Sequence, residues 1–396
     1  MRLTPRLVAT DTPPIPAAAR WRSAYDGRLG PIIDLAQAVP GTPPPHELLQ
    51  RLAEAAAAAE TTTYGPIVGD GGLRDALAAD IANVYGGDVA ADDIVITAGC
   101  NQAFYVAMLA LAAPGDAVIL PTPWYFNHKM TLDMLGITAV PLPCRADAGF
   151  VPDVADARAL LSSATSAIVL VTPNNPTGAV YPPEVIAAFA ALARDAGIAL
   201  VIDETYRDFL PKGVARPHDL LATPGWRDTV IQLYSFSKSF AIPGHRLGAL
   251  TAGQSAIEQI AKVLDCMTIC PPRVPQAPVA WAIEGTRVWR EEMRAVINAR
   301  SGLFRAAIAR APGWSISSAG AYFAYVKHPL AASAEVAAER LAAEAGIATL
   351  PGSFFGPGQD DHLRFAVANV GESQLKIVSE RLRAVKPDKL TSFTAR

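Results

Sequence analysis

Charged residues are scarce in this chain of 396 residues. Lysine, arginine, aspartate and glutamate make up 18% of it, below the roughly 25% of an average soluble protein. The 34 basic and 37 acidic residues nearly balance at a net charge of −3, and no stretch is a polybasic run. We therefore see no electrostatic reason to expect nucleic acid or an anionic membrane surface as a partner. Apolar residues instead make up 51%, enough to bury a large core and to exclude an intrinsically disordered chain.

Cysteine is also rare. The chain has four cysteines, too few for a disulfide framework at this length. Cys266 and Cys270 lie four positions apart, without a second pair or a histidine at zinc-binding spacing nearby. We expect buried, reduced thiols at these two positions and no metal site.

Long apolar runs are missing as well. The uncharged stretch 94–115 is interrupted by Gly99, Asn101 and Gln102, and the remaining run Ala103–Ala113 is too short to cross a bilayer. The first 20 residues contain no continuous apolar segment of the kind found in secretory signals. We expect a soluble, cytoplasmic protein without a membrane partner.

The apolar residues occur in short runs that end at polar or glycine-rich turns and are followed by stretches of helical length. Continuous rather than alternating apolar runs are typical of strands that are covered on both faces. The run 246–251 follows its predecessor too closely for a crossover helix, so an antiparallel position is one option for it. The pattern predicts an α/β fold with strands at 93–97, 116–120, 166–171, 198–202, 229–233 and 246–251 and helices near 101–113 and 183–196.

The order of the predicted helices and strands changes near Arg287. Two helical stretches flank a strand candidate at 322–326, and a last strand at 362–367 precedes a helix near 372–385. We expect a smaller α+β domain here and an extended arm and a linker in the proline-rich segments 12–16 and 40–45. The predicted division is 1–46 for the N-terminal arm and part of the small domain, 47–284 for the large domain, and 285–396 for the C-terminal small domain.

Unusual polar residues follow the predicted strands of the large domain. In an open parallel sheet, ligands bind beyond the carboxyl ends of the strands, so these side chains are expected to converge on one site. They comprise Gly99, Cys100, Asn101, Tyr125, Asn175, Asp203, Tyr206, Ser235, Lys238 and Arg246.

Three of these positions suggest a specific chemistry. A carboxylate at Asp203, directly after four apolar residues, needs a partner if it is buried and can hold a heteroaromatic nitrogen in its protonated form. Lys238 lies among aromatic residues, and desolvation lowers the pKa of an amine so that it can attack carbonyl groups. A helix beginning after Gly99 presents backbone N–H groups to an anion.

Each residue also has an ordinary structural interpretation. Asp203 can cap a helix or form a salt bridge, and Lys238 can be a solvated surface charge. The segment Asn174–Gly178 can be only a turn. Arg246 can bind a phosphate through two hydrogen bonds or pair with a carboxylate.

Taken together, the motifs resemble those of the fold-type I pyridoxal-phosphate enzymes, in particular the class I and II aminotransferases related to aspartate aminotransferase. The resemblance runs from Ile33 to about Arg383, and the motifs occur in the order and at the spacing of that family. It implies a large domain with a mostly parallel, seven-stranded sheet that binds pyridoxal 5′-phosphate. The motifs are Tyr64-Gly-Pro, Thr97-Ala-Gly-Cys-Asn-Gln-Ala103, Pro123-Trp-Tyr125, Asn174-Asn-Pro-Thr-Gly178, Asp203-Glu-Thr-Tyr206, Ser235-Phe-Ser-Lys238, Gly244-His-Arg246 and Leu363-Arg-Phe365.

The resemblance implies a role for each position. Lys238 would hold the cofactor aldehyde as a Schiff base and then carry a proton to and from the substrate. Asp203 would pair with the pyridine nitrogen, and Asn175 and Tyr206 would hydrogen-bond the ring oxygen. Further implied contacts are a ring stack from Tyr125 and phosphate binding by Gly99, Cys100, Asn101, Ser235 and Arg246.

Two further roles concern the substrate and a second subunit. Arg364 would bind the substrate carboxylate with its planar guanidinium fork, next to Asn175. Tyr64 would reach the phosphate of the other subunit, which implies a homodimer with shared active sites.

Two positions bear on the substrate side chain. Ala38 stands where the family more often has glycine, and its methyl group is expected to narrow one side of the pocket. Arg273 is a candidate for the second arginine that dicarboxylate-selective members use.

We expect an aminotransferase that moves the amino group of an L-amino acid to a 2-oxo acid by ping-pong kinetics. A carbon–sulfur β-lyase on the same fold is the alternative, because the two reactions differ in which Cα bond is held perpendicular to the ring. The sequence leaves the donor open. A serine acyl transferase is disfavoured because Ser-Asp-Asn and Lys-Thr-Gly segments are missing.

Overall fold

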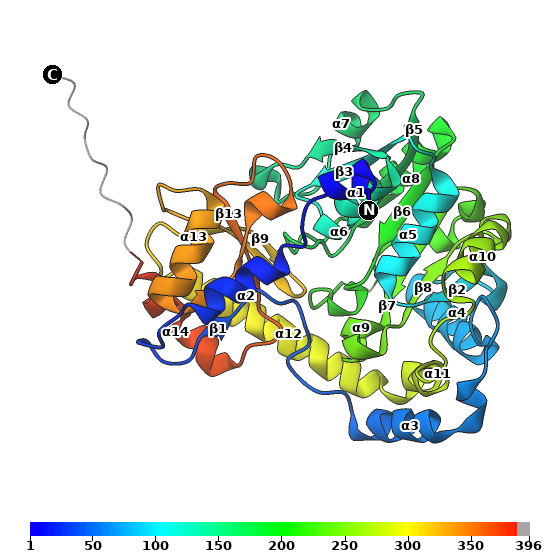
Figure 1. Cartoon of the computed structure of the whole chain (residues 1–396), viewed down its shortest axis with the longest axis horizontal. Coiled ribbons are helices and arrows are strands. Elements are labelled where there is room, and N and C mark those ends of the chain that lie inside the picture. The colour runs from blue at the N-terminus through cyan, green and yellow to red at the C-terminus, as the bar shows by residue number, and fades with distance from the viewer. Residues whose placement is uncertain (215, 386–396) are drawn as a thin grey trace.

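The computed structural model describes residues 1–214 and 216–385, which form two layered units joined by a long helix (Figure 1). A seven-stranded sheet organises the larger unit, in the order β2-β8-β7-β6-β5-β3-β4. All neighbouring strands are parallel except β8, which pairs antiparallel with β2 and β7. The strands are β2 (Ile94–Thr97), β3 (Ala117–Thr122), β4 (Thr138–Pro143), β5 (Thr165–Val171), β6 (Ala199–Asp203), β7 (Val230–Ser235) and β8 (Gly248–Thr251).

Helices cover both faces of this sheet, as the continuous apolar strands require. Along β5, Ile168 and Leu170 enter one buried cluster, whereas Val169 enters the cluster on the opposite face, because successive side chains of a strand point to opposite sides. This arrangement confirms the predicted α/β class. The helices are α3 (His46–Ala57), α4 (Gly71–Tyr85), α5 (Cys100–Leu111), α6 (Phe126–Leu135), α7 (Val154–Ala159), α8 (Pro183–Ala196), α9 (Phe236–Ser239), α10 (Gln254–Thr268) and α11 (Gln276–Gly285).

The second unit is built on a four-stranded antiparallel sheet in the order β12-β13-β10-β9. Its strands are β9 (Ser315–Gly320), β10 (Phe323–Lys327), β12 (Leu350–Pro351) and β13 (His362–Ala366). A separate parallel pair joins β1 (Ile33–Asp34) to β11 (Ile347–Ala348), so a segment near the N-terminus belongs to this unit. The helices of the unit are α2 (Ile15–Ser23), α12 (Arg287–Ile308), α13 (Ala334–Arg340), which continues as a π-helix over Leu341–Ala345, and α14 (Glu372–Leu382).

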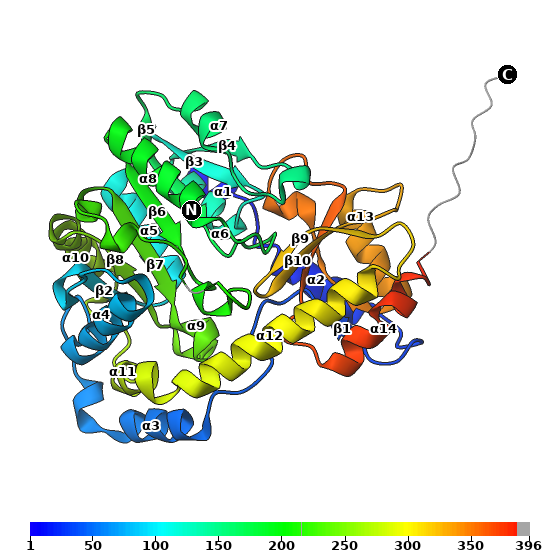
Figure 2. The same ribbon diagram turned by 180° about the vertical axis from the view of Figure 1, so that it is seen from behind.

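The helix α12 connects the two units. It begins beside α11 under the large sheet and ends against α14 and β9 of the smaller sheet (Figure 2). The chain therefore changes from one unit to the other near residue 286. The division at residues 46/47 and 284/285 stays a prediction, and residues 386–396 of its last part lie outside the described residues.

Two expectations were wrong. The segment 12–16 is not extended throughout: residues 12–14 lie outside any helix, but Ile15 and Pro16 belong to α2 (Ile15–Ser23). Pro16 lies at the start of this helix, where its missing N–H costs no hydrogen bond. A further short helix, α1 (Pro5–Ala9), precedes the segment. Cys266 is exposed and Cys270 is half-buried. Cys266 lies outside the buried stripe of α10, formed by Ile257, Ile260 and Leu264.

The expectation that no segment crosses a membrane can be compared with the helices of the structure. Within residues 1–214 and 216–385, no helix is both long enough and apolar enough to span a bilayer.

Candidate active site

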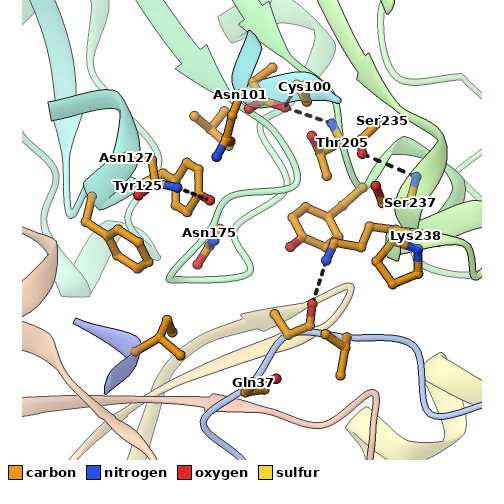
Figure 3. A pocket seen from close by; sticks show the side chains of 18 of the residues that line it. Gln37, Cys100, Asn101, Tyr125, Asn127, Asn175, Thr205, Ser235, Ser237 and Lys238 are labelled. Carbon is orange, nitrogen blue, oxygen red and sulfur yellow. Dashed lines mark hydrogen bonds between the residues drawn. The ribbon is translucent and has the colours of Figure 1, made fainter. Parts of the chain in front are cut away.

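A cavity of about 410 Å3 opens at the carboxyl edge of the large sheet, facing the smaller unit (Figure 3). Polar side chains reach it from the ends of β5, β6 and β7, from the start of α5 and from β13. The structure brings together eleven of the thirteen predicted positions in its lining: Ala38, Cys100, Asn101, Tyr125, Asn175, Asp203, Tyr206, Ser235, Lys238, Arg246 and Arg364.

Asp203 lies buried at the end of β6. Its carboxylate is 3.3 Å from His128 Nε2 and accepts a hydrogen bond of 2.9 Å from the amide of Thr205. Burial alone would raise the pKa of Asp203, but the hydrogen bond and charge of His128 and the bonds from Thr205 outweigh it and lower the pKa. The carboxylate therefore stays ionised in a desolvated place, as a site for a cationic heterocycle requires.

Lys238 follows β7 on the short helix α9, which is capped by Ser235, whose Oγ accepts a hydrogen bond from the Ser237 amide. Its amine donates a hydrogen bond of 2.6 Å to the carbonyl of Ala38, the contact that Figure 3 marks below Lys238. Burial, followed by the charges of Arg364 and Arg246, lowers the pKa of Lys238 to about 8. An amine in this state is available as a nucleophile and as a proton carrier near neutral pH.

An anion site forms where α5 begins. Gly99 precedes the helix with φ +90°, a conformation that favours glycine. A Cβ at this position would lie 2.1 Å from Arg246 Nη2, so glycine leaves the space that the guanidinium occupies. The free N–H groups of the first helical turn and the Arg246 side chain thus meet in one corner, which suits a phosphate.

A buried amide and two phenols complete the wall. Asn175 is buried and accepts a hydrogen bond of 3.4 Å from Arg364 Nη1. Tyr206 packs against the rings of Tyr322 and Phe323, and burial raises its pKa well above the usual value. Burial also raises the pKa of Tyr125 to about 12, so both phenols remain hydrogen-bond donors.

Arg364 projects from β13 of the smaller unit into the cavity. It donates to the carbonyl of Ala36, and its Nε is buried without a partner among the described residues. The guanidinium lies 5.3 Å from the ring of Phe323 and 5.4 Å from that of Phe355. Burial lowers the pKa of Arg364 to about 10. A buried cation whose Nε–H lacks an acceptor is a receptor for a carboxylate.

The other two of the thirteen positions, Gly99 and Tyr64, lie outside the cavity, and so does the further candidate Arg273. Gly99 is directly behind the cavity, at the start of α5. Tyr64 is 75% exposed and does not reach the cavity of its own chain. Arg273 is 3.3 Å from the carboxylate of Asp70 and donates to the carbonyl of Thr63, so it too lies away from this cavity.

Sequence reasoning missed His128, which stacks on Phe104 at 3.9 Å and supports Asp203. The available signal was its position three residues after Tyr125, which places both on one side of the first turn of a helix. Thr205, Ser237, Gln37 and Asn127 also line the cavity and were not predicted.

The comparison with known proteins agrees with this geometry. Residues 30–382 match the family described as aminotransferase class I and II. The chain belongs to this family. An aminotransferase activity follows from that membership, and the carbon–sulfur lyase alternative is not favoured.

Named relatives and solved structures in the family cover most of the chain. An aspartate/prephenate aminotransferase from Thermus thermophilus is 30% identical over 361 residues, 89% of this chain and 91% of the relative. An arginine–pyruvate transaminase from Pseudomonas aeruginosa is 30% identical over 327 residues, 82% of each chain. The Thermus thermophilus aspartate aminotransferase solved with maleate is 28% identical, with a TM-score of 0.88 over 97% of this chain and 99% of that chain.

Proposed function

We propose that this aminotransferase binds pyridoxal 5′-phosphate in the cavity described above and moves the amino group of an L-amino acid to a 2-oxo acid in two half-reactions. One observation carries the proposal: a desolvated amine, an ionised buried carboxylate and an anion site meet in a single cavity. These three groups match the aldehyde, the ring nitrogen and the phosphate of this cofactor.

The polar groups of the cavity match the groups of the cofactor. Arg246, Ser235 and the first amides of α5 would hold the phosphate, in the space that Gly99 leaves open. Asp203, supported by His128, would hold a proton on the ring nitrogen. Asn175 and Tyr206 would donate to the ring oxygen, and Tyr125 would lie against the ring.

Pyridoxal phosphate, when bound, supplies an electron sink for bond changes at the substrate Cα. Lys238 would bond to the cofactor in the resting enzyme. Once the substrate has replaced it, its amine would take the proton from the substrate Cα and return it to the carbon of the cofactor aldehyde. Its lowered pKa suits this task, because the neutral amine is accessible near pH 8. Arg364 would exchange the Ala36 carbonyl for the substrate carboxylate and so fix the orientation of Cα.

We also propose a homodimer with shared active sites. The segments 64–67 and 266–270, called the Tyr64 face below, expose Tyr64, Ile67, Met267 and Ile269. One contact joins the segments, in which the Gly65 amide lies 3.4 Å from Cys270 Sγ, and a second lies just beyond their ends, where Arg273 donates to the Thr63 carbonyl. A second copy would cover this apolar surface and receive Tyr64 near its phosphate site.

The cytoplasm is the proposed location. All four cysteines are free, including the exposed Cys266, which suits a reducing compartment.

Reduction with borohydride tests the proposed function. Treatment of the cofactor-loaded protein should leave the cofactor mass on the peptide that contains Lys238, and Lys238→Ala should show no such adduct and should lose amino transfer by more than about 100-fold. Lys129→Ala, which removes a lysine paired with Asp133 outside this cavity, serves as the control and should keep the adduct. An adduct on another lysine would contradict the proposal.

A further inference from the structure

Within residues 1–214 and 216–385, no cation that lines the cavity is free to bind a charged substrate side chain. Among the described residues that line it, the basic side chains are Lys238, Arg246 and Arg364. Lys238 and Arg364 have the cofactor and carboxylate roles proposed above. Arg246 bonds to the carbonyl of Pro243 and lies against Gly99 at the phosphate corner. Asp203 is the acidic residue of this lining, and His128 pairs with it.

The wall next to Arg364 is apolar. The Arg364 guanidinium lies 5.4 Å from the ring of Phe355, and that ring is 5.7 Å from the ring of Phe126. Ile15, at the start of α2, packs with Phe126 on the same apolar cluster, and both line the cavity. A carboxylate held on Arg364 would therefore place the rest of its amino acid near Phe126 and Ile15.

The Tyr64 face of a second copy would not supply the missing charge. The Tyr64 face consists of Tyr64-Gly-Pro-Ile67 and Cys266-Met-Thr-Ile-Cys270, neither of which contains a charged residue. The neighbouring cation, Arg273, is already paired with Asp70. This face would therefore bring no uncompensated charge to a carboxylate on the substrate side chain, which would lose its water without gaining a counter-charge there.

We propose that the side-chain end of this cavity selects amino acids with uncharged, mainly apolar side chains, and that Ile15 and Phe126 form the selecting wall. This inference rests on the proposed function and names its substrate class. This substrate class differs from aspartate and arginine, the charged amino acids after which the relatives from Thermus and Pseudomonas are named. Arginine is disfavoured as a donor as well, because Asp203, the one acidic side chain among the described residues that line the cavity, already pairs with His128.

The first test is a donor panel on the cofactor-loaded enzyme. Leucine, methionine and phenylalanine should show kcat/KM values on the order of 100-fold higher than aspartate, glutamate and arginine. Aspartate or glutamate as the best donor would overturn the inference while leaving the proposed function intact. No amino transfer from any donor would instead overturn the proposed function.

A binding measurement decides the inference independently of turnover. Calorimetry on the cofactor-loaded enzyme would compare succinate, a dicarboxylate, with 4-methylpentanoate, a monocarboxylate with an apolar end. The monocarboxylate should bind at least about 10-fold more tightly. Equal or tighter binding of succinate would contradict an uncharged wall.

An introduced cation provides the matched variant. Ile15→Arg should raise the ratio of kcat/KM for aspartate to that for leucine by about 10-fold or more, because it supplies the missing counter-charge. Ile15→Met, which keeps the wall apolar, should leave the ratio close to that of the unmodified enzyme. An unchanged ratio in Ile15→Arg would remove Ile15 from the selecting wall.

Discussion

Burial beside Arg364 and Arg246 lowers the pKa of Lys238 to about 8. The same residue type on an open surface would be protonated across the neutral range, with a pKa near 10.4. The difference arises from the environment, since desolvation and like charges both disfavour the ammonium form. The reactivity of this side chain is therefore a property of the cavity and not of the short motif that contains it.

Competitive amine labelling of the cofactor-free protein measures this directly. Because the neutral amine is the reactive form, labelling of Lys238 should rise with pH around a midpoint of about pH 8. Arg364→Gln removes one of the charges that lower the pKa, so the midpoint should move upward. Arg51→Gln, which breaks a surface pair with Glu47 on α3, should leave the midpoint in place. A midpoint near the usual value for lysine in the unmodified protein would refute the burial of this amine.

His128 gives a second prediction for a single residue. His128→Phe keeps a ring against Phe104 but removes the donor to Asp203, so it should lower the free energy of unfolding by about 1–3 kcal/mol at pH 7. His128 holds the pKa of Asp203 down, and its contribution is present above the unfolded aspartate pKa. The difference should therefore shrink as the pH falls through and below 3.8, the ordinary value for aspartate.

Urea unfolding at pH 7 and at pH 3 would check both points. His128→Gln, which keeps a donor, is the comparison and should lose less stability at pH 7. A loss that is independent of pH would mean that His128 contributes only by packing.

Residues with a distinctive local pattern were predictable, and residues defined by a distant contact were not. Lys238, Asp203 and Asn175 each follow a recognisable strand, so their meeting at one edge could be inferred. Neither the bond from Lys238 to the Ala38 carbonyl, 200 positions away, nor the pairing of His128 with Asp203 has a local signature. These contacts depend on the packed arrangement of separate elements.

At the scale of elements, the start of α5 combines a backbone requirement with a binding role. Gly99→Ala would force a Cβ against Arg246 Nη2 and strain a positive φ, at a cost of about 1–3 kcal/mol. We expect at least about 10-fold weaker binding of pyridoxal 5′-phosphate by the cofactor-free protein, measured by calorimetry.

Gly302→Ala is the matched control, because Gly302 lies inside α12 and a Cβ there meets no atom within 4 Å. It should bind the cofactor normally and gain about 0.5–1 kcal/mol of stability. Equal cofactor affinities in the two variants would contradict a role of Gly99 in the anion site.

Elements with continuous apolar sequence were the most predictable. The helix α8 spans 183–196 as expected, with Pro183 in its first turn and Gly197 after its end. By contrast, β4 was not predicted, because it contains Pro141 and Pro143 and lies at the edge of the sheet, where a missing N–H is tolerated. The strand β9 was missed for another reason: its sequence, Ser-Ile-Ser-Ser-Ala-Gly, is largely polar.

At the scale of the whole molecule, α12 links the unit that carries Lys238 to the unit that carries Arg364. With 22 residues, it is about 33 Å long. The two halves of the candidate site therefore belong to different units of the chain. The sequence predicted both units, but not that Ile15 from the N-terminal arm would complete the wall between them.

The proposed dimer makes a complementation experiment possible. Lys238→Ala and Tyr64→Ala should each reduce activity at limiting cofactor. Mixing the two variants under conditions that exchange subunits should restore activity to about a quarter of that of the unmodified enzyme, because each mixed dimer contains one site with both native residues. Mixing Lys238→Ala with Asp203→Asn is the control, since those residues lie in the same cavity of one chain. A mixture of the first two variants that stays inactive would contradict the shared site.

The carbonyls of Ala36 and Ala38 accept hydrogen bonds from Arg364 and Lys238, respectively. These two peptide groups act as internal surrogates that keep both cations aimed inward before a reactant arrives. A substrate carboxylate would then replace the Ala36 carbonyl as the acceptor for Arg364, and that side chain would lose little rotameric freedom. If both side chains turned to other acceptors, the linker between β1 and α3 would lose these two hydrogen bonds and keep those of Leu35 to its neighbouring strands.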